Sequence, residues 1–327
     1  MGEYPRMETL HRYPLIFNPK AKSQKGERTL RFLMEHANRF ALYASNHEAE
    51  ARELAAKFAA DGEPVVVAAG GDGTLNAVVK GLAGSGTALG VIPAGTMNVF
   101  ARELGIPFDN LQRCFDVIER GHVREIDLFE ANRAPFIQMA GVGFDAMVIE
   151  ETTWESKKML GPLAYLLAAV KVLGEKPSKM EIVCKDGRRE EGVAVLAGNG
   201  SLYGGQFRLF RAADNQDSKL DVLVFKEAGY KLVLDSLKGL ALGGVDLAAS
   251  TSYFQAEEFM VKADAKVPVE VDGDLLGRYS EVRFAAASRK LRVIAPEIVT
   301  SSRFADAVKA LLQWTRRPPE LLESPRA

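Results

Sequence analysis

Short apolar runs alternate with longer amphipathic segments along the first third of the chain. The runs at 14–17, 65–68 and 88–92 are almost wholly apolar, as strands buried on both faces usually are. Helical periodicity marks the segments between and after them, at 25–37, 48–60, 74–82, 97–104 and 110–120. Strands alternating with helices predict a parallel sheet covered by helices. We therefore expect an α/β domain over residues 13–127.

The pattern changes near residue 128. Two helices are expected first, at 143–152 and 160–174, and strand-like runs then dominate, with one helix at 230–240 between them. The runs lie at 179–184, 191–198, 219–225, 251–262, 267–271, 279–285 and 290–295. We interpret 128–297 as a second domain built on antiparallel β-structure. A final amphipathic helix at about 300–317 is expected to pack back on the first domain.

Composition narrows the class of protein. The chain is 47% hydrophobic and 26% charged with a net charge of −1, which fits a globular protein and gives no global field to attract nucleic acid. Its two cysteines, Cys114 and Cys184, have no metal-ligand spacing and fit a reducing cytoplasm. The N-terminus has no apolar core like that of a signal peptide, and no run of about eighteen apolar residues exists. We expect a cytoplasmic protein.

Three polar or glycine-rich turns follow predicted strands, at 18–19, 70–73 and 93–98. Ligands of such sheets bind beyond the carboxyl ends of the strands, so we expect the turns to converge on one edge. The glycines of the second turn leave backbone N–H groups open to phosphate. Asp72, in the same turn, needs a cation between itself and a phosphate, which indicates a nucleotide handled with Mg²⁺. The alternatives are a structural strand-to-helix turn and, for Thr96 or Asn98, a helix N-cap.

Two further motifs lie in the second region. Asp272 and Asp274 flank Gly273 and would share one face of a regular strand. The alternative interpretation of Asp-Gly-Asp is an acidic turn between two strands. The segment 141–146, Gly-Val-Gly-Phe-Asp-Ala, mimics a dinucleotide fingerprint. An apolar helical stretch follows it in place of a second strand and a ribose-binding acid, so we reject that interpretation.

Taken in order, these motifs resemble the diacylglycerol kinase catalytic superfamily, which includes sphingosine kinases and bacterial phospholipid kinases. The resemblance covers residues 13–297. The matching pieces are Asn18-Pro19-Lys20-Ala21, Gly70-Gly71-Asp72-Gly73-Thr74, Gly95-Thr96-Met97-Asn98 with Ala101-Arg102, Ile126-Asp127, Gly143-Phe144-Asp145-Ala146, Tyr203-Gly204-Gly205, Asp217 with Leu220-Asp221-Val222, and Val271-Asp272-Gly273-Asp274.

The resemblance implies an ATP-binding first domain, a β-sandwich-like lipid-binding second domain, and ATP in the cleft between them. It implies that Asp272, with Asp72, serves catalysis, with Asp272 as general base on a lipid hydroxyl. It implies that Asp145 contacts the lipid head group. The implied nucleotide-binding residues are Asn18, Lys20, Gly70, Gly71, Gly73, Thr74, Gly95, Thr96 and Asn98. The implied Mg²⁺ ligands are Asp72, Asp127, Asp217 and Asp274.

The chain departs from the family pattern at two positions. Val99 stands where the family usually has an aspartate, and Ser218 replaces the glycine after Asp217.

From the resemblance as a whole we expect an ATP- and Mg²⁺-dependent lipid kinase of lipid metabolism that contacts the membrane transiently and binds no nucleic acid. A homodimer is left open. The rival hypotheses are a soluble-substrate kinase like NAD kinase and a non-catalytic lipid-binding regulator.

Overall fold

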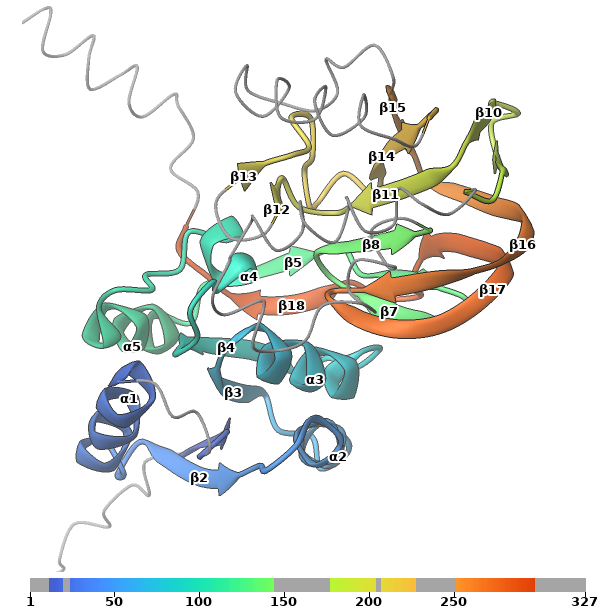
Figure 1. The fold of residues 1–327 in the computed structure, drawn as a ribbon. Helices are drawn as coiled ribbons and strands as arrows, with labels where there is room; N and C mark the ends of the chain where they lie inside the picture. Colours follow the sequence, from blue (N-terminus) through green and yellow to red (C-terminus); the bar gives the residue numbers. More distant parts are fainter. Residues whose placement is uncertain (1–11, 20–23, 144–176, 204–206, 228–250, 298–327) are drawn as a thin grey trace, which may run out of the picture. The chain divides into compact units, whose positions relative to one another are not determined.

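Two sheets organise the chain in the computed structural model, which describes residues 12–19, 24–143, 177–203, 207–227 and 251–297. Both sheets belong to one compact unit that ends at Ala295. The first is a six-stranded sheet in the order β2-β1-β3-β4-β18-β5 (Figure 1), with β5 antiparallel to its neighbour and every other pair parallel. Its strands are β1 Tyr13–Phe17, β2 Phe40–Ala44, β3 Val65–Gly70, β4 Ala88–Pro93, β5 Val123–Ile126 and β18 Leu291–Ile294.

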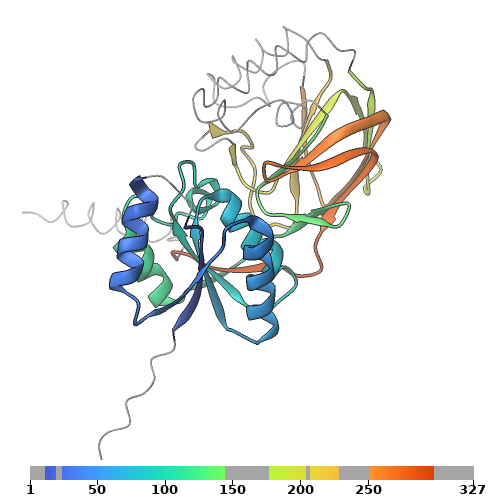
Figure 2. The same ribbon diagram turned by 60° about the horizontal axis from the view of Figure 1, so that its bottom comes forward.

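Helices lie on both faces of this sheet (Figure 2). Along β1 and β3 the side chains of Ile16 and Val66 join one apolar cluster with α2 and α3, whereas Leu15 and Val67 join another with α1 and α5. Burial on both faces explains why these strands are continuously apolar. The helices are α1 Gln24–Glu35, α2 Glu48–Ala60, α3 Asp72–Leu82, α4 Val99–Glu103 and α5 Leu111–Arg120.

Strand β18 is the point at which the structure departs from the predicted grouping. The sequence pattern places 290–295 with the second region, but Val293 pairs in parallel with Leu89 of β4 and antiparallel with Arg124 of β5. A four-residue strand carries no information about its partner, which is chosen here by long-range packing of Leu291 and Val293 in the first core.

The second region forms a ten-stranded antiparallel sheet, which confirms the predicted fold class. Its main path runs β15-β14-β11-β8-β16-β17-β6-β7, and β9 joins β10 to β16. The strands are β6 Phe129–Ala131, β7 Ala134–Phe136, β8 Met139–Val142, β9 Met180–Cys184, β10 Arg189–Gly192, β11 Ala194–Gly198, β14 Leu220–Phe225, β15 Thr251–Ala256, β16 Glu258–Val271 and β17 Asp274–Ala286. A separate ribbon pairs β12 Leu202–Tyr203 with β13 Phe207–Arg208.

Strand β16 gives this sheet its sandwich-like form. Its first half pairs with β9 and its second half with β8, and the register shifts between Lys262 and Val267. Such an irregularity bends a strand and lets it serve two sheet layers. Residues of both halves then share one core, in which the rings of Phe259 and Phe284 stack with centroids 4.7 Å apart.

Several predicted elements fall outside the described residues. They are the helices at 143–152, 160–174, 230–240 and 300–317, of which the first shares only residue 143 with the described part. Among the described residues, the predicted strand at 251–262 is two strands, because the pairing changes partner after Ala256. None of the helices in the described part of the chain is long and apolar enough to cross a membrane.

Candidate functional site

The turns after β1, β3 and β4 meet at one edge of the first sheet, as predicted. Strand pairing places Phe17 beside Ala69 and Gly70 beside Pro93, so the following residues leave the sheet together. The second and third turns touch: a Cβ built on Gly95 would lie 2.5 Å from the Cα of Gly71. Glycine is required at position 95 because the two backbones approach too closely for a side chain, whereas a Cβ on Gly71 would make a tight contact of 3.3 Å with the Cα of Gly95.

The glycine turn also packs against its own helix and against α2. A Cβ on Gly70 would lie 2.6 Å from the Cβ of Thr74, and one on Gly73 would lie 2.8 Å from Oε1 of Glu48. Gly71 is the N-cap of α3 and offers no side chain to the first N–H groups of that helix. Open N–H groups at a helix N-terminus favour a phosphate.

Asp72 is tied to the third turn. Its Oδ1 accepts a hydrogen bond from the N–H of Val99 at 2.8 Å, and the amides of Asn98 and Phe100 also interact with it. Burial nevertheless raises the pKa of Asp72, against the lowering effect of these amides. Val99 stands where the family usually has a second aspartate, and its backbone N–H hydrogen-bonds to the first aspartate, Asp72.

Thr96 and Asn98 have different surroundings in the third turn. Asn98 is fully buried with φ of 49°, and its amide side chain accepts from the Gly95 N–H at 3.0 Å and donates to the Gly95 carbonyl at 2.9 Å. The Asn98 side chain therefore closes the loop and makes no N-cap hydrogen bond to α4. Thr96 is exposed at the edge where the three turns meet.

Asp272 occupies a two-residue turn between β16 and β17. Val271 pairs with Asp274, and Asp272 and Gly273 have φ of 50° and 87°, as expected for a type I′ turn. The Asp272 carboxylate is directed inward and accepts from three successive amides, those of residues 137–139: Ile137 donates to Oδ2 at 3.0 Å, and the next two donate to Oδ1 at 2.8 and 3.1 Å.

Helix α3 contacts the same turn. Asn76 donates through Nδ2 to the carbonyl of Asp272 at 3.1 Å, and one helical turn later Lys80 forms an ion pair with Asp274 at 2.8 Å. Burial raises the pKa of Asp272 to about 6, although the three amides and then Lys80 oppose the rise. Burial, followed by repulsion from Asp274, also raises the pKa of Glu48.

Asp127 and Asp217 form a second acidic region, at the end of β5. The buried Asp127 carboxylate accepts from the Ser218 N–H at 2.6 Å and pairs with Lys290 at 2.7 Å. Burial raises the pKa of Asp217, and the charges of Asp214 and Asp127 add to the rise. Ser218 has φ of 63°, a conformation that glycine adopts without strain.

Four residues that sequence reasoning missed hold the site together. Besides Asn76, Lys80 and Lys290, Glu103 of α4 accepts from Ser201 and Leu202 N–H groups at 3.0 and 2.9 Å. The spacing of Asn76 and Lys80, four residues apart on one helix, was a signal for a shared contact face. The partners of Lys290 and Glu103 lie far away in sequence, and no local pattern indicates them.

The predicted Mg²⁺ ligands do not gather into one protein cage. Within the described residues no group of three His, Cys, Asp or Glu side chains could hold a metal ion. Lysines already neutralise Asp127 and Asp274. A Mg²⁺ ion held mainly by substrate phosphates needs only one or two carboxylates, and Asp72 beside the glycine turn fits that need. Lys20 and Asp145 lie outside the described residues.

Comparisons with known proteins agree with this architecture. Residues 12–131 match the family described as Diacylglycerol kinase catalytic domain, and residues 138–295 match the YegS C-terminal NAD kinase beta sandwich-like domain. A diacylglycerol kinase of Bacillus subtilis is 28% identical over 301 residues, which cover 88% of this chain and 97% of the relative. Residues 12–131 therefore form a diacylglycerol kinase catalytic domain and the chain is a kinase, and ATP is the phosphoryl donor that such a domain implies.

Solved structures share the fold. A diacylglycerol kinase of Bacillus anthracis has a TM-score of 0.71 at 23% identity, covering 88% of this chain and 98% of that one. An NAD kinase of Archaeoglobus fulgidus, solved in complex with ATP, has a TM-score of 0.50 at 12% identity, covering 90% and 98%. At these identities the likeness concerns the fold alone, so it does not choose between acceptors.

The contact between the second and third turns yields a prediction. Gly95→Ala places a Cβ against the Gly71 backbone, which must separate the turns; we expect weaker ATP binding and a loss of about 1–3 kcal/mol in unfolding free energy. Titration with a fluorescent ATP analogue and thermal unfolding measure both. Gly86→Ala is the matched control, since nothing lies within 4 Å of its Cβ. ATP affinity unchanged in Gly95→Ala contradicts the prediction.

Proposed function

We propose that this kinase transfers the γ-phosphate of ATP to the hydroxyl of a lipid, such as diacylglycerol, a sphingoid base or a related phospholipid, with the help of Mg²⁺. The observation that supports the proposal most is that α3 contacts both the glycine turn and the turn of Asp272. The helix begins at the glycine turn, and its Asn76 and Lys80 hold the turn that carries Asp272 and Asp274. One rigid element thereby links a phosphate-binding turn to a candidate base.

In this proposal Asp272 is the general base. Its Oδ2 accepts only one of the three amide hydrogen bonds, which leaves a lone pair for the proton of the acceptor hydroxyl. A pKa of about 6 keeps the carboxylate unprotonated near neutral pH and makes it more basic than an ordinary aspartate. The hydroxyl oxygen then bonds to the γ-phosphorus, the bond from that phosphorus to the bridging oxygen breaks, and ADP leaves.

The remaining roles follow the three turns. Gly70, Gly71, Gly73 and Thr74 bind phosphates through backbone N–H groups and the threonine hydroxyl. The other nucleotide contacts are proposed for Asn18, Lys20, Gly95, Thr96 and Asn98. Because the Asn98 amide is committed to Gly95, Asn98 acts by shaping the loop, and the exposed Thr96 is the better direct contact.

Mg²⁺ would supply charge neutralisation on the transferred phosphoryl group. Asp72 is the carboxylate we assign to it, directly or through water. The same role for Asp127, Asp217 and Asp274 stays a prediction, as does head-group contact by Asp145. We also propose domain limits of 13–127 and 128–297. Strand β18, at the end of the second of these ranges, joins the first sheet.

The function is tested by offering purified protein labelled ATP and a panel of acceptors. Vesicles or micelles carrying diacylglycerol, a sphingoid base or phosphatidylglycerol are compared with NAD in the absence of lipid. We expect label in a lipid and none in NAD. Label in NAD favours the soluble-substrate kinase. Lipid binding without any ATP turnover, over a range of Mg²⁺ concentrations, favours the non-catalytic regulator.

Asp272→Asn tests the proposed base. Loss of a general base lowers turnover by about 10²–10⁴-fold. In the unmodified chain, kcat/KM should fall as pH drops below about 6, because a protonated Asp272 cannot accept a second proton. Asp272→Asn should have a much lower turnover, and its kcat/KM should no longer fall near pH 6.

Asp264→Asn is the matched control, an exposed aspartate on β16, the strand that leads into the Asp272 turn, and should leave both rate and pH profile unchanged. Circular dichroism checks that each variant folds. Normal turnover in a folded Asp272→Asn, or a kcat/KM that stays flat through pH 6 in the unmodified chain, refutes the assignment.

Asp72→Asn tests the proposed metal ligand. The asparagine keeps an oxygen for the hydrogen bond from the Val99 amide at the start of α4, but it removes the negative charge. We expect the Mg²⁺ concentration for half-maximal activity to rise about 10–100-fold. The exposed Asp61→Asn serves as control. An unshifted Mg²⁺ dependence in Asp72→Asn means that this carboxylate does not serve the metal.

A further inference from the structure

A hollow of about 270 Å³ opens beside the Asp272 turn, on the side of α2 and α3. Its charged lining consists of Arg52, Lys80, Arg133 and Asp274, and its apolar wall includes Pro135 and Leu275. The volume lies below the roughly 300–1,000 Å³ of sites for drug-sized ligands, so it suits a head group and not a whole lipid. None of the proposed nucleotide contacts lines it.

The charges in this hollow do not cancel. Lys80 and Asp274 form an ion pair at 2.8 Å. Arg52 and Arg133 are both exposed, and no hydrogen bond or ion pair joins either side chain to another part of the chain that the structure describes. The guanidinium groups of Arg52 and Arg133 can therefore bind an anion. Guanidinium matches phosphate geometry with paired N–H donors.

Arg133 occupies a position that suits another residue better. Asn132 and Arg133 form the two-residue turn between β6 and β7, with φ of 48° and 71°. Such a type I′ turn favours glycine at its second position, because a side chain is strained at positive φ. A strained and exposed arginine at the rim of a hollow, with no partner in the part of the chain that the structure describes, points to a function rather than to turn stability.

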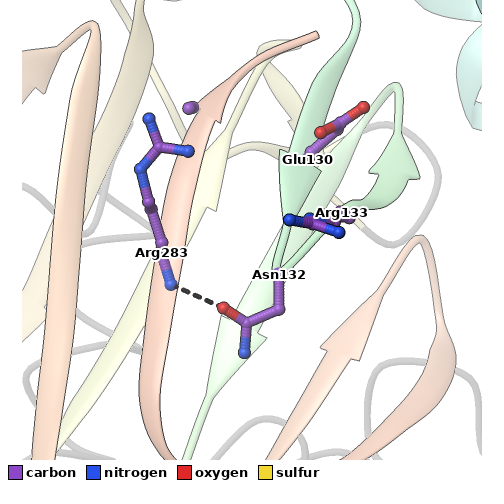
Figure 3. A pocket seen from close by; sticks show the side chains of 5 residues that line it. Glu130, Asn132, Arg133 and Arg283 are labelled. Atoms are coloured by element: carbon purple, nitrogen blue, oxygen red, sulfur yellow. Dashed lines mark hydrogen bonds between the residues drawn. The ribbon is translucent and has the colours of Figure 1, made fainter.

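Arg133 also borders a second hollow, of about 310 Å³, beside Glu130, Asn132 and Arg283 (Figure 3). That hollow differs in charge. Its other guanidinium, on Arg283, is paired with Glu258 at 2.7 Å, and the Glu130 carboxyl also lines it. Within the described residues Arg133 has no charged partner in either hollow, and only the first hollow adds a second arginine without one, Arg52.

The first hollow combines this charge with exposed hydrocarbon. Leu275 is 45% exposed, one of the few large apolar side chains open to solvent in the described residues. A ligand that satisfies both features carries a phosphate next to an apolar body. We propose that this hollow binds the phosphate head group of an anionic phospholipid, with Arg52 and Arg133 as its ligands, and so holds the chain on the membrane beside Asp272.

The proposal goes beyond the kinase reaction, because the bound lipid need not be the acceptor. Binding is measured without ATP, by sedimentation with vesicles of phosphatidylcholine alone or mixed with phosphatidylglycerol. We expect binding to the mixed vesicles only, falling as salt increases. Arg52→Gln with Arg133→Gln should weaken it at least about tenfold. The charge-matched control is Arg31→Gln with Arg120→Gln, on α1 and α5, and should bind like the unmodified chain.

Arg133→Gly separates binding from folding. Glycine relieves the strain at positive φ, so the melting temperature should hold or rise while vesicle binding falls. Vesicle binding equal to that of the control pair, in either Arg133→Gly or the double variant, overturns the proposal. Inorganic phosphate and glycerol 3-phosphate identify the source of the anion. Failure of both to compete at millimolar concentration supports a lipid, whereas arginine-dependent binding of these ions without vesicle binding overturns it.

Discussion

The hydrogen bonds of the Asp272 carboxylate, which is directed inward from the half-buried tip of the β16–β17 hairpin, are the interaction on which the arrangement of the site depends. Its oxygens accept three amides from residues 137–139, and its own carbonyl accepts from Asn76. One turn residue thereby joins β17, the segment before β8 and the helix of the glycine turn. Burial raises the pKa of the Asp272 carboxylate, and the three amide hydrogen bonds lower it, so that the pKa lies at about 6. The contacts that fix the group thus also set its basicity.

A second constraint is the close approach of two glycine-containing turns. The backbones of Gly71 and Gly95 touch, and Asp72 reaches across the contact to the Val99 amide. This geometry gives a physical account of Val99, where the family usually has a carboxylate. Its N–H still secures Asp72, so the fold of the two turns does not need the missing side chain. What changes is the number of negative charges beside the two turns, which is one fewer than in the usual family pattern.

The sequence predicts the parallel sheet because buried strands such as β3 and β4 are apolar on both faces, and it predicts the edge where their turns meet. It misses short or edge strands such as β2 and β5, whose half-exposed patterns resemble loops. It also misses Lys80 and Lys290, because their carboxylate partners are distant in sequence. Asp274 lies 194 residues from Lys80, and Asp127 meets Lys290 only because β5 pairs with β18. Ion pairing between distant segments depends on the fold itself, and no local spacing encodes it.

Lysine pairing bears directly on how the chain meets its acceptor. Asp274 and Asp127 each have an ammonium group within 2.8 Å, so the protein itself neutralises these two carboxylates. A net charge of −1 gives no general attraction to an anionic surface, and any attraction must come from a local excess of cations. Where Lys80 is committed to Asp274, the neighbouring Arg52 and Arg133 supply that excess. The proposed transfer site thus draws on the first sheet, α3 and the β16–β17 turn, while the two arginines proposed to bind a membrane surface lie beside that turn and have no proposed part in the chemistry.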